Sequence, residues 1–183
     1  FQRITRYGSD PGKYWWEVID ASGTRSIYGR SAAARLADPD PPPGSRGNVF
    51  RWHLERVIDL HGNEMRFDYQ AATGGGGEGQ GPDWVMLYPK SIRWTLGTDI
   101  APTYEVVFRL ESGRPDVITS GRPGFKTRID QRLAAIDVYE KDELIRHYAL
   151  AYHDADTKRH FGKSLLASIA MSATSDGTDA YTH

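Results

Sequence analysis

The 183-residue sequence has no cysteine, no long apolar run and no excess of charge of either sign. The missing cysteines exclude a disulfide scaffold, a thiolate metal site and a cysteine nucleophile. No apolar stretch approaches the roughly 20 residues that a membrane-spanning helix needs. The 23 Lys and Arg balance 24 Asp and Glu, which argues against a dedicated nucleic-acid-binding protein, because such proteins carry a basic excess.

The sequence begins Phe-Gln-Arg-Ile, with no initiator Met and no signal-peptide pattern. We therefore expect it to be a piece of a longer protein, whose targeting signal lies elsewhere.

Residues that suit a half-buried pleated sheet are abundant, with 10 Tyr, 6 Phe and 5 Trp. Alternating runs separated by turn residues recur along the chain. We predict an all-β, mostly antiparallel fold of meanders and hairpins, in a single domain over residues 1–183. The expected strands are Tyr14–Asp20, Thr24–Tyr28, Trp52–Ile58, Met65–Tyr69, Trp84–Tyr88, Ile92–Leu96, Tyr104–Glu111, Ile129–Tyr139 and Leu144–His153.

Four segments depart from this pattern. Ser31–Ala37 is a short helical candidate, and Ser164–Ala173 fits either a last strand or a short helix. Residues 38–47 contain four prolines, which cannot join a strand ladder, and residues 73–82 are rich in glycine. Both lie between expected strands, so we interpret them as loops within one domain.

The clearest hairpin joins the Trp52 and Phe67 strands. Its turn contains Asp59, Gly62 and Asn63, which we predict to be structural turn residues. One turn residue is expected to need a positive φ, which glycine adopts freely.

No catalytic or cofactor-binding residue is predicted. The glycine run at residues 74–79 has the spacing of a dinucleotide-binding loop, but a strand follows it where a helix is needed. Gly162-Lys163-Ser164 lacks the earlier glycine of a phosphate-binding loop. No Gly-x-Ser-x-Gly motif is present, whereas a spatial pair of carboxylates stays open because sequence spacing does not reveal it.

No metal site is predicted either. His147 and His153 share a face of one expected strand, but six residues at about 3.3 Å each place them about 20 Å apart. Asp154 and Asp156 begin like a calcium loop, in which Arg159 replaces the required glycine.

A series of short motifs occurs in a fixed order along some 170 positions. They include Phe1–Ile4, Tyr14–Val18, Gly23-Thr24, Tyr28-Gly29, Trp52–Leu54, Asp59, Gly62-Asn63, Phe67–Tyr69, Tyr88–Ile92, Arg114–Asp116, Arg146–Tyr152 and Ser164–Leu166. In this order they resemble the SpvB-type domain, which occurs in a Salmonella plasmid virulence protein and in the B subunits of insecticidal Tc toxins. The Asp-x-x-Gly-Asn hairpin also occurs in the related Rhs and YD-repeat proteins.

This resemblance implies a non-catalytic segment of a larger Rhs-type β shell that encapsulates a toxic polypeptide and helps to deliver it. The implied partners are a Tc-type C subunit and a pore-forming A subunit, reached through the rest of the parent chain, with no nucleic acid and no membrane contact. The resemblance also implies that the parent protein is secreted from a bacterium and is found in the cytoplasm before export. The ADP-ribosyltransferase of the virulence protein needs a Glu-x-Glu pair, which this sequence lacks.

In a shell, the aromatic residues would pack rather than bind, and those we expect to be structural are Trp52, Tyr69, Tyr148 and Tyr152. The alternative is a secreted β-sheet module that recognises carbohydrate or a cell-surface protein. Its obvious platform is Tyr14-Trp15-Trp16, although neighbouring strand residues point to opposite faces, so one tryptophan is expected to face a core.

Overall fold

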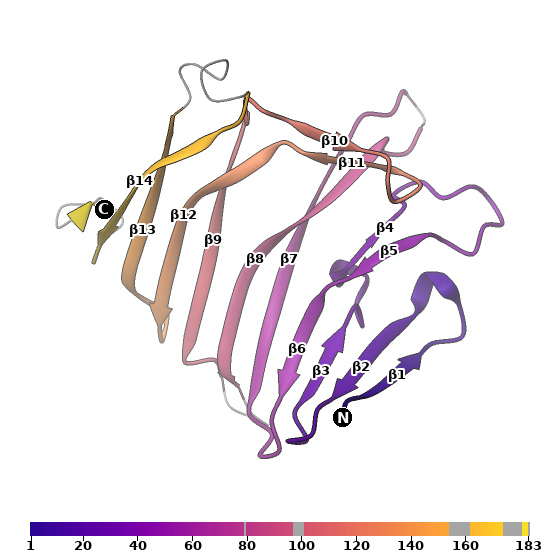
Figure 1. Ribbon diagram of the computed structural model, residues 1–183, viewed down its shortest axis with the longest axis horizontal. Helices are drawn as coiled ribbons and strands as arrows, with labels where there is room; N and C mark the ends of the chain where they lie inside the picture. Colours follow the sequence, from indigo (N-terminus) through magenta and orange to yellow (C-terminus); the bar gives the residue numbers. More distant parts are fainter. Residues whose placement is uncertain (79, 97–100, 154–161, 174–180, 183) are drawn as a thin grey trace. The chain divides into compact units, whose positions relative to one another are not determined.

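A computed structural model describes residues 1–78, 80–96, 101–153, 162–173 and 181–182 (Figure 1). The chain forms two compact units: unit 1 is Phe1–Ala101 with Thr119–Arg128, and unit 2 is Pro102–Ile118 with Ile129–His183. Both consist almost entirely of antiparallel strands, which confirms the predicted all-β fold. The single-domain organisation stays a prediction.

Helix is nearly absent from the part of the chain that the structure describes. It holds two 3-10 turns of three residues each, η1 (Pro11–Lys13) and η2 (Ala32–Ala34). Neither comes near the length that a membrane-crossing helix requires.

Unit 1 contains a sheet in the order β1-β2-β3-β6-β7-β8, with antiparallel neighbours. Its strands are β1 (Arg3–Tyr7), β2 (Trp15–Ile19), β3 (Arg25–Tyr28), β6 (Leu54–Ile58), β7 (Glu64–Gly74) and β8 (Trp84–Leu96). Strand β11 (Lys126–Ile129) runs parallel to the start of β8 and also pairs with β10 (Ile118–Ser120). Strands β4 (Arg35–Ala37) and β5 (Val49–Trp52) form a separate pair.

Strands β8 and β7 each correct one expectation. Strand β8 is continuous, whereas two strands, Trp84–Tyr88 and Ile92–Leu96, were expected on either side of Pro89. The register with β7 shifts there, because Tyr69 pairs with Pro89 and Asp68 with Ser91. Such a bulge accommodates a proline that cannot donate a ladder hydrogen bond. Strand β7 in turn includes residues 73 and 74, so the glycine loop begins later than the predicted 73–82.

The helical candidate Ser31–Ala37 is also wrong. Only its three alanines form a 3-10 turn, and Arg35–Ala37 pairs with β5 as strand β4. The strand conformation buries Leu36 beside Val85, Leu87 and Phe125, which together form the hydrophobic core cluster of the unit. Burial of these apolar side chains outweighs the helix propensity of a short alanine run.

Unit 2 contains strands in the order β9-β12-β13-β14-β15. Their bounds are β9 (Tyr104–Ser112), β12 (Gln131–Glu140), β13 (Glu143–His153), β14 (Leu165–Ser172) and β15 (Tyr181–Thr182). Strand β14 settles the alternative left open for Ser164–Ala173, because it pairs with β13 from Leu165 to Ser172.

The two faces of each sheet differ in chemistry, because cross-strand partners point to the same side. In unit 1 the face that we call charged carries the row Thr5, Glu17, Ile27, Arg56, Arg66 and Arg93, together with the Tyr7–Trp15 pair. The face that we call apolar carries the row Ile4, Val18, Ser26, Val57 and Met65, together with the Arg6–Trp16 pair. In unit 2 the row Val107, Asp137, His147 and Ser172 is polar, and the row Phe108, Ile136, Tyr148 and Met171 is apolar.

Asp116 fixes the start of β14 within unit 2. Its carboxylate accepts hydrogen bonds from Nε and Nη2 of Arg114 at 2.7 and 3.0 Å, and from the backbone N and Oγ of Ser164 at 3.0 and 2.5 Å. Only 2% of the Asp116 side chain is exposed. The hydrogen bonds from Arg114, with those from Ser164, outweigh desolvation and lower the pKa of Asp116 far below 3.8.

We predict that Asp116→Asn destabilises the protein by about 1–3 kcal/mol at pH 7, because buried donors lose their charged acceptor. A lowered folded-state pKa gives stability that is present above pH 3.8 and lost as the pH falls. The difference between wild type and variant in urea unfolding should therefore shrink at pH 3. A difference that is equal at both pH values would contradict the assignment.

Candidate functional site

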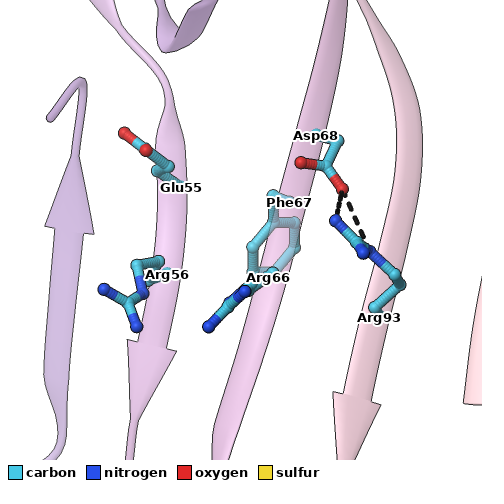
Figure 2. A pocket seen from close by; sticks show the side chains of 6 residues that line it. All are labelled: Glu55, Arg56, Arg66, Phe67, Asp68 and Arg93. Atoms are coloured by element: carbon cyan, nitrogen blue, oxygen red, sulfur yellow. Dashed lines mark hydrogen bonds and ion pairs between the residues drawn. The ribbon is translucent and has the colours of Figure 1, made fainter. Parts of the chain in front are cut away.

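Three arginines lie side by side on the charged face of unit 1. Arg56 on β6 pairs in register with Arg66 on β7, which pairs with Arg93 on β8. A pocket of about 320 Å³ lies over them, and Figure 2 shows its lining residues, Glu55, Arg56, Arg66, Phe67, Asp68 and Arg93. We call these three guanidinium groups the arginine row.

Two carboxylates bind the arginine row, and one of them, Glu64, bridges two of its members. Glu64 accepts both Nε and Nη2 of Arg56, at 2.6 and 2.5 Å, and Nε of Arg66 at 2.5 Å. Asp68 accepts Nε and Nη2 of Arg93 through one oxygen, at 3.2 and 2.6 Å. Burial acts to raise the pKa of Glu64, but the bonds from Arg56 and Arg66 outweigh it and lower that pKa, so Glu64 stays ionised.

The arginine row was not predicted from the sequence. A signal was available for two members, because a hairpin centred on residue 61 places residue 56 opposite residue 66. The third member could not be inferred, since two register shifts between β7 and β8 determine that Arg93 reaches Arg66. One of these shifts accompanies Thr95, a non-glycine residue with φ of 60°.

The β6–β7 turn is organised by Asp59. Its Oδ1 accepts the backbone N–H groups of His61 and Asn63, both at 2.8 Å, and its Oδ2 accepts Nδ2 of Asn63 at 2.7 Å. Gly62 has φ of +83°, and no heavy atom beyond its chain neighbours lies within 4 Å of where a Cβ would be. This geometry is that of an Asx-type turn with a left-handed residue.

Trp52 and Tyr69 each use their polar atom to tie loops and strands together. Trp52 Nε1 donates to the Tyr14 carbonyl at 2.6 Å, and its ring meets Trp16 edge-on at 5.8 Å between centroids. Tyr69 Oη donates to the Leu54 carbonyl at 2.7 Å. Burial, with a smaller effect of Glu55, raises the pKa of Tyr69. A structural role for both side chains stays a prediction.

The other two predicted structural aromatics lie on β13 in unit 2. Tyr152 Oη donates to the Leu133 carbonyl at 2.6 Å, and Arg132 lies over its ring at 4.3 Å from the centroid. Tyr148 is half-buried and pairs with Ile136 and Met171 on the apolar face.

His147, weighed above as a metal ligand, is part of a charged network. Its Nδ1 lies 2.6 Å from Oδ1 of the buried Asp137, whose Oδ2 accepts Nε of Arg109 at 2.7 Å. Within the described ranges, no three His, Asp or Glu side chains gather as a metal site would require. Asp154 and Asp156, the weak calcium candidates, lie outside the described residues.

The possible sugar platform is engaged within unit 1. Trp15 stacks on Tyr7 at 4.1 Å with an interplanar angle of 11°, and Arg30 lies 5.4 Å from its ring centroid. Trp16 packs against Trp52. Arg6 lies 4.2 Å from the centroid of the Tyr14 ring. A flat aromatic face for a sugar would therefore require these internal contacts to separate.

Half-buried His53 has an unsatisfied polar atom near these aromatics. Its Nε2 makes no hydrogen bond among the described residues, and its ring lies 4.8 Å from that of Tyr69. Burial, reinforced by the charge of Arg51, lowers the pKa of His53 below 6.5.

The fold described above also occurs in solved toxin structures. The N-terminal domain of the effector SpvB from Salmonella typhimurium superposes with a TM-score of 0.72 at 18% identity, over 95% of this chain and 66% of that one. The TcdB2–TccC3 crystal structure gives 0.73 at 15% identity, and the Photorhabdus luminescens Tc holotoxin pore gives 0.71 at 15%. Each covers 100% of this chain, which spans 11% and 10% of theirs.

Residues 1–82 match the family described as Salmonella virulence plasmid 65kDa B protein. The mono(ADP-ribosyl)transferase SpvB of Salmonella typhimurium is 26% identical over 102 residues, which are 53% of this chain. The match covers 17% of that relative, about a sixth of its length. The resemblance to the SpvB-type domain predicted from the sequence is thus confirmed.

We predict that Gly62→Val destabilises the protein by about 1–3 kcal/mol, because valine is strained at φ of +83° although nothing crowds it. Gly121→Val is the matched control, since Gly121 also has open space around it but no positive φ. Urea midpoints of the two variants give the comparison. Equal midpoints would show that the Gly62 backbone is not strained by a side chain.

We also predict that acid destabilises the fold through His53. Its lowered pKa means that the unfolded chain binds the proton more tightly, so stability is full above pH 6.5 and falls below it. The urea midpoint of wild type should drop between pH 8 and pH 5.5, and that of His53→Phe should drop less. The idea fails if the phenylalanine variant shows the same pH dependence as wild type.

Proposed function

We propose that this chain is a non-catalytic wall segment of a bacterial toxin-complex shell, which encloses a toxic polypeptide and helps to deliver it. The observation that carries the proposal is the TcdB2–TccC3 likeness, which extends over 100% of the chain with a TM-score of 0.73. The chain would be one stretch of a much longer parent, in keeping with its small share of the matched proteins.

The two-faced sheets support this role on physical grounds. In unit 1 the charged face pairs Glu17, Glu64 and Asp68 with arginines of neighbouring strands. The apolar face leaves Ile4 62% and Met65 36% exposed. An open apolar hollow of about 320 Å³ lies at Val57, Met65 and Trp94. A sheet with one polar and one apolar face needs a second layer that covers the apolar face. In a shell, other parts of the parent protein would supply that layer.

The absence of a role in catalysis is part of the proposal. The homologous stretch is 17% of the ADP-ribosyltransferase relative, so that activity would belong to another part of such a protein. The Arg109–Asp137–His147 network is also held by hydrogen bonds between neighbouring strands of the sheet. Such a network stabilises the sheet, and this role requires no catalytic side chain.

The partners and location follow from the same proposal. A Tc-type C subunit would close the shell, and a pore-forming A subunit would receive it, both through parts of the parent chain beyond this segment. The parent would be secreted by a bacterium. The Tc complex components among the structural neighbours support this assignment.

The test is to produce the parent protein with a Tc-type C subunit and to add protease. We expect a hollow particle by electron microscopy and an enclosed polypeptide that resists digestion. Met65→Lys should weaken both results, because it places a charge on the apolar face, while leaving the fold intact by circular dichroism.

Val117→Lys is the matched control, because Val117 is 40% exposed and lies in a loop. The parent protein that carries this substitution should assemble normally. Digestion of the polypeptide in the wild-type complex would refute the shell role. ADP-ribosyltransferase activity measured for this segment alone would also refute the shell role.

A further inference from the structure

The arginine row carries an electrostatic cost that the chain only partly relieves. Like charges directly opposite on neighbouring strands repel, and here three arginines hold consecutive register positions. Glu64 and Asp68 relieve Arg56 and Arg93, each through two hydrogen bonds. Arg66, in the centre, donates only its Nε, to a carboxylate that Arg56 already shares.

The terminal nitrogens of Arg66 are therefore available. A guanidinium offers five N–H donors in a fork that matches two oxygens of one anion. Among the described residues the Arg66 guanidinium bonds to Glu64 alone, through Nε, and 43% of its side chain is exposed. Both carboxylates that line the pocket are engaged elsewhere: Asp68 accepts from Arg93, and Oε2 of Glu55 accepts the backbone N–H of Ser31 at 2.8 Å.

The pocket gives these donors a defined surrounding. Its volume of about 320 Å³ is at the lower end of ligand-binding pockets, enough for a small anion or one acidic side chain. Figure 2 shows the Arg56 and Arg66 side chains extending in the same direction from neighbouring strands, with Arg93 turned to Asp68. An entering oxyanion would meet the Nη groups of Arg66, with Arg56 and Arg93 on either side.

We propose that this pocket binds an oxyanion, a carboxylate or phosphate group that Arg66 holds with both terminal nitrogens. The ligand would arrive as a free anion or as an acidic side chain of a polypeptide. Because Glu64, Asp68 and Glu55 offset the three arginines, attraction at long range is small and specificity comes from the fork geometry. The site is independent of the shell role.

The experiment is an NMR titration of the ¹⁵N-labelled protein at low salt, observing backbone amides and arginine Nε–H signals. One arm adds a blocked hexaglutamate peptide and the other adds inorganic phosphate. We expect saturable shifts centred on β6, β7 and β8, with a dissociation constant on the order of millimolar, as suits an open ion-pair site. Binding in both arms indicates a free-anion site, and binding of the peptide alone indicates an acidic side chain as ligand.

Arg66→Gln should weaken binding about tenfold or more, and Arg66→Lys should restore it only in part, because lysine keeps the charge but loses the fork. Arg146→Gln is the control, since it removes an exposed positive charge from β13 in unit 2. The proposal is overturned if neither probe saturates, or if Arg66→Gln and Arg146→Gln weaken binding equally. Thermal unfolding verifies that each variant is folded, and Arg66→Lys decides if the glutamine variant is not.

Discussion

Charged side chains that join neighbouring strands are the interaction on which both sheets depend. Arg25 binds Glu17 between β3 and β2, Arg56 binds Glu64 between β6 and β7, and Arg93 binds Asp68 between β8 and β7. In unit 2, Arg109 and His147 both bind Asp137, and Arg132 binds Glu111. An exposed ion pair stabilises a protein little, about 0–1 kcal/mol. Here several pairs are half-buried and follow one another across the strands, so they define which residues face each other.

This constraint explains how a chain with so few fully buried residues keeps a defined register. Ile27 is the only large side chain among the described residues with less than 2% exposure, so a dense core cannot specify the strand pairing alone. A slip of one residue would move every side chain to the other face. It would separate Glu17 from Arg25 and Asp137 from Arg109, and would leave nearly buried carboxylates without a partner, which costs far more than an exposed pair contributes.

Alternation and turn chemistry were sufficient to predict the all-β class, the Asp59–Asn63 hairpin and most of strands β9, β12 and β13. The expected Trp52–Ile58 strand is divided, because Trp52 ends β5 and Leu54 begins β6. Short strands such as β4 and β10 were missed, because three residues show no period. The β8 strand was divided at Pro89, because the bulge that accommodates the proline depends on the pairing with β7. The arginine row was missed for the same reason: it exists only once three strands are in register. The pairing of residues within one hairpin can be predicted from the sequence of its turn. A pairing that depends on a bulge, as between β7 and β8, cannot be predicted in this way.

The separation of charge and apolar surface also limits how such a chain can associate. The charged face resists stacking on another sheet, because its ion pairs would lose water without gaining partners. The apolar face, with Ile4 and Met65 exposed, gains from any cover that removes it from water, at roughly 25 cal/mol for each Å². A second sheet layer is therefore favoured on the apolar side only. A sheet that gains from a second layer on its apolar side, and whose other side carries cross-strand ion pairs, agrees with the wall role proposed above.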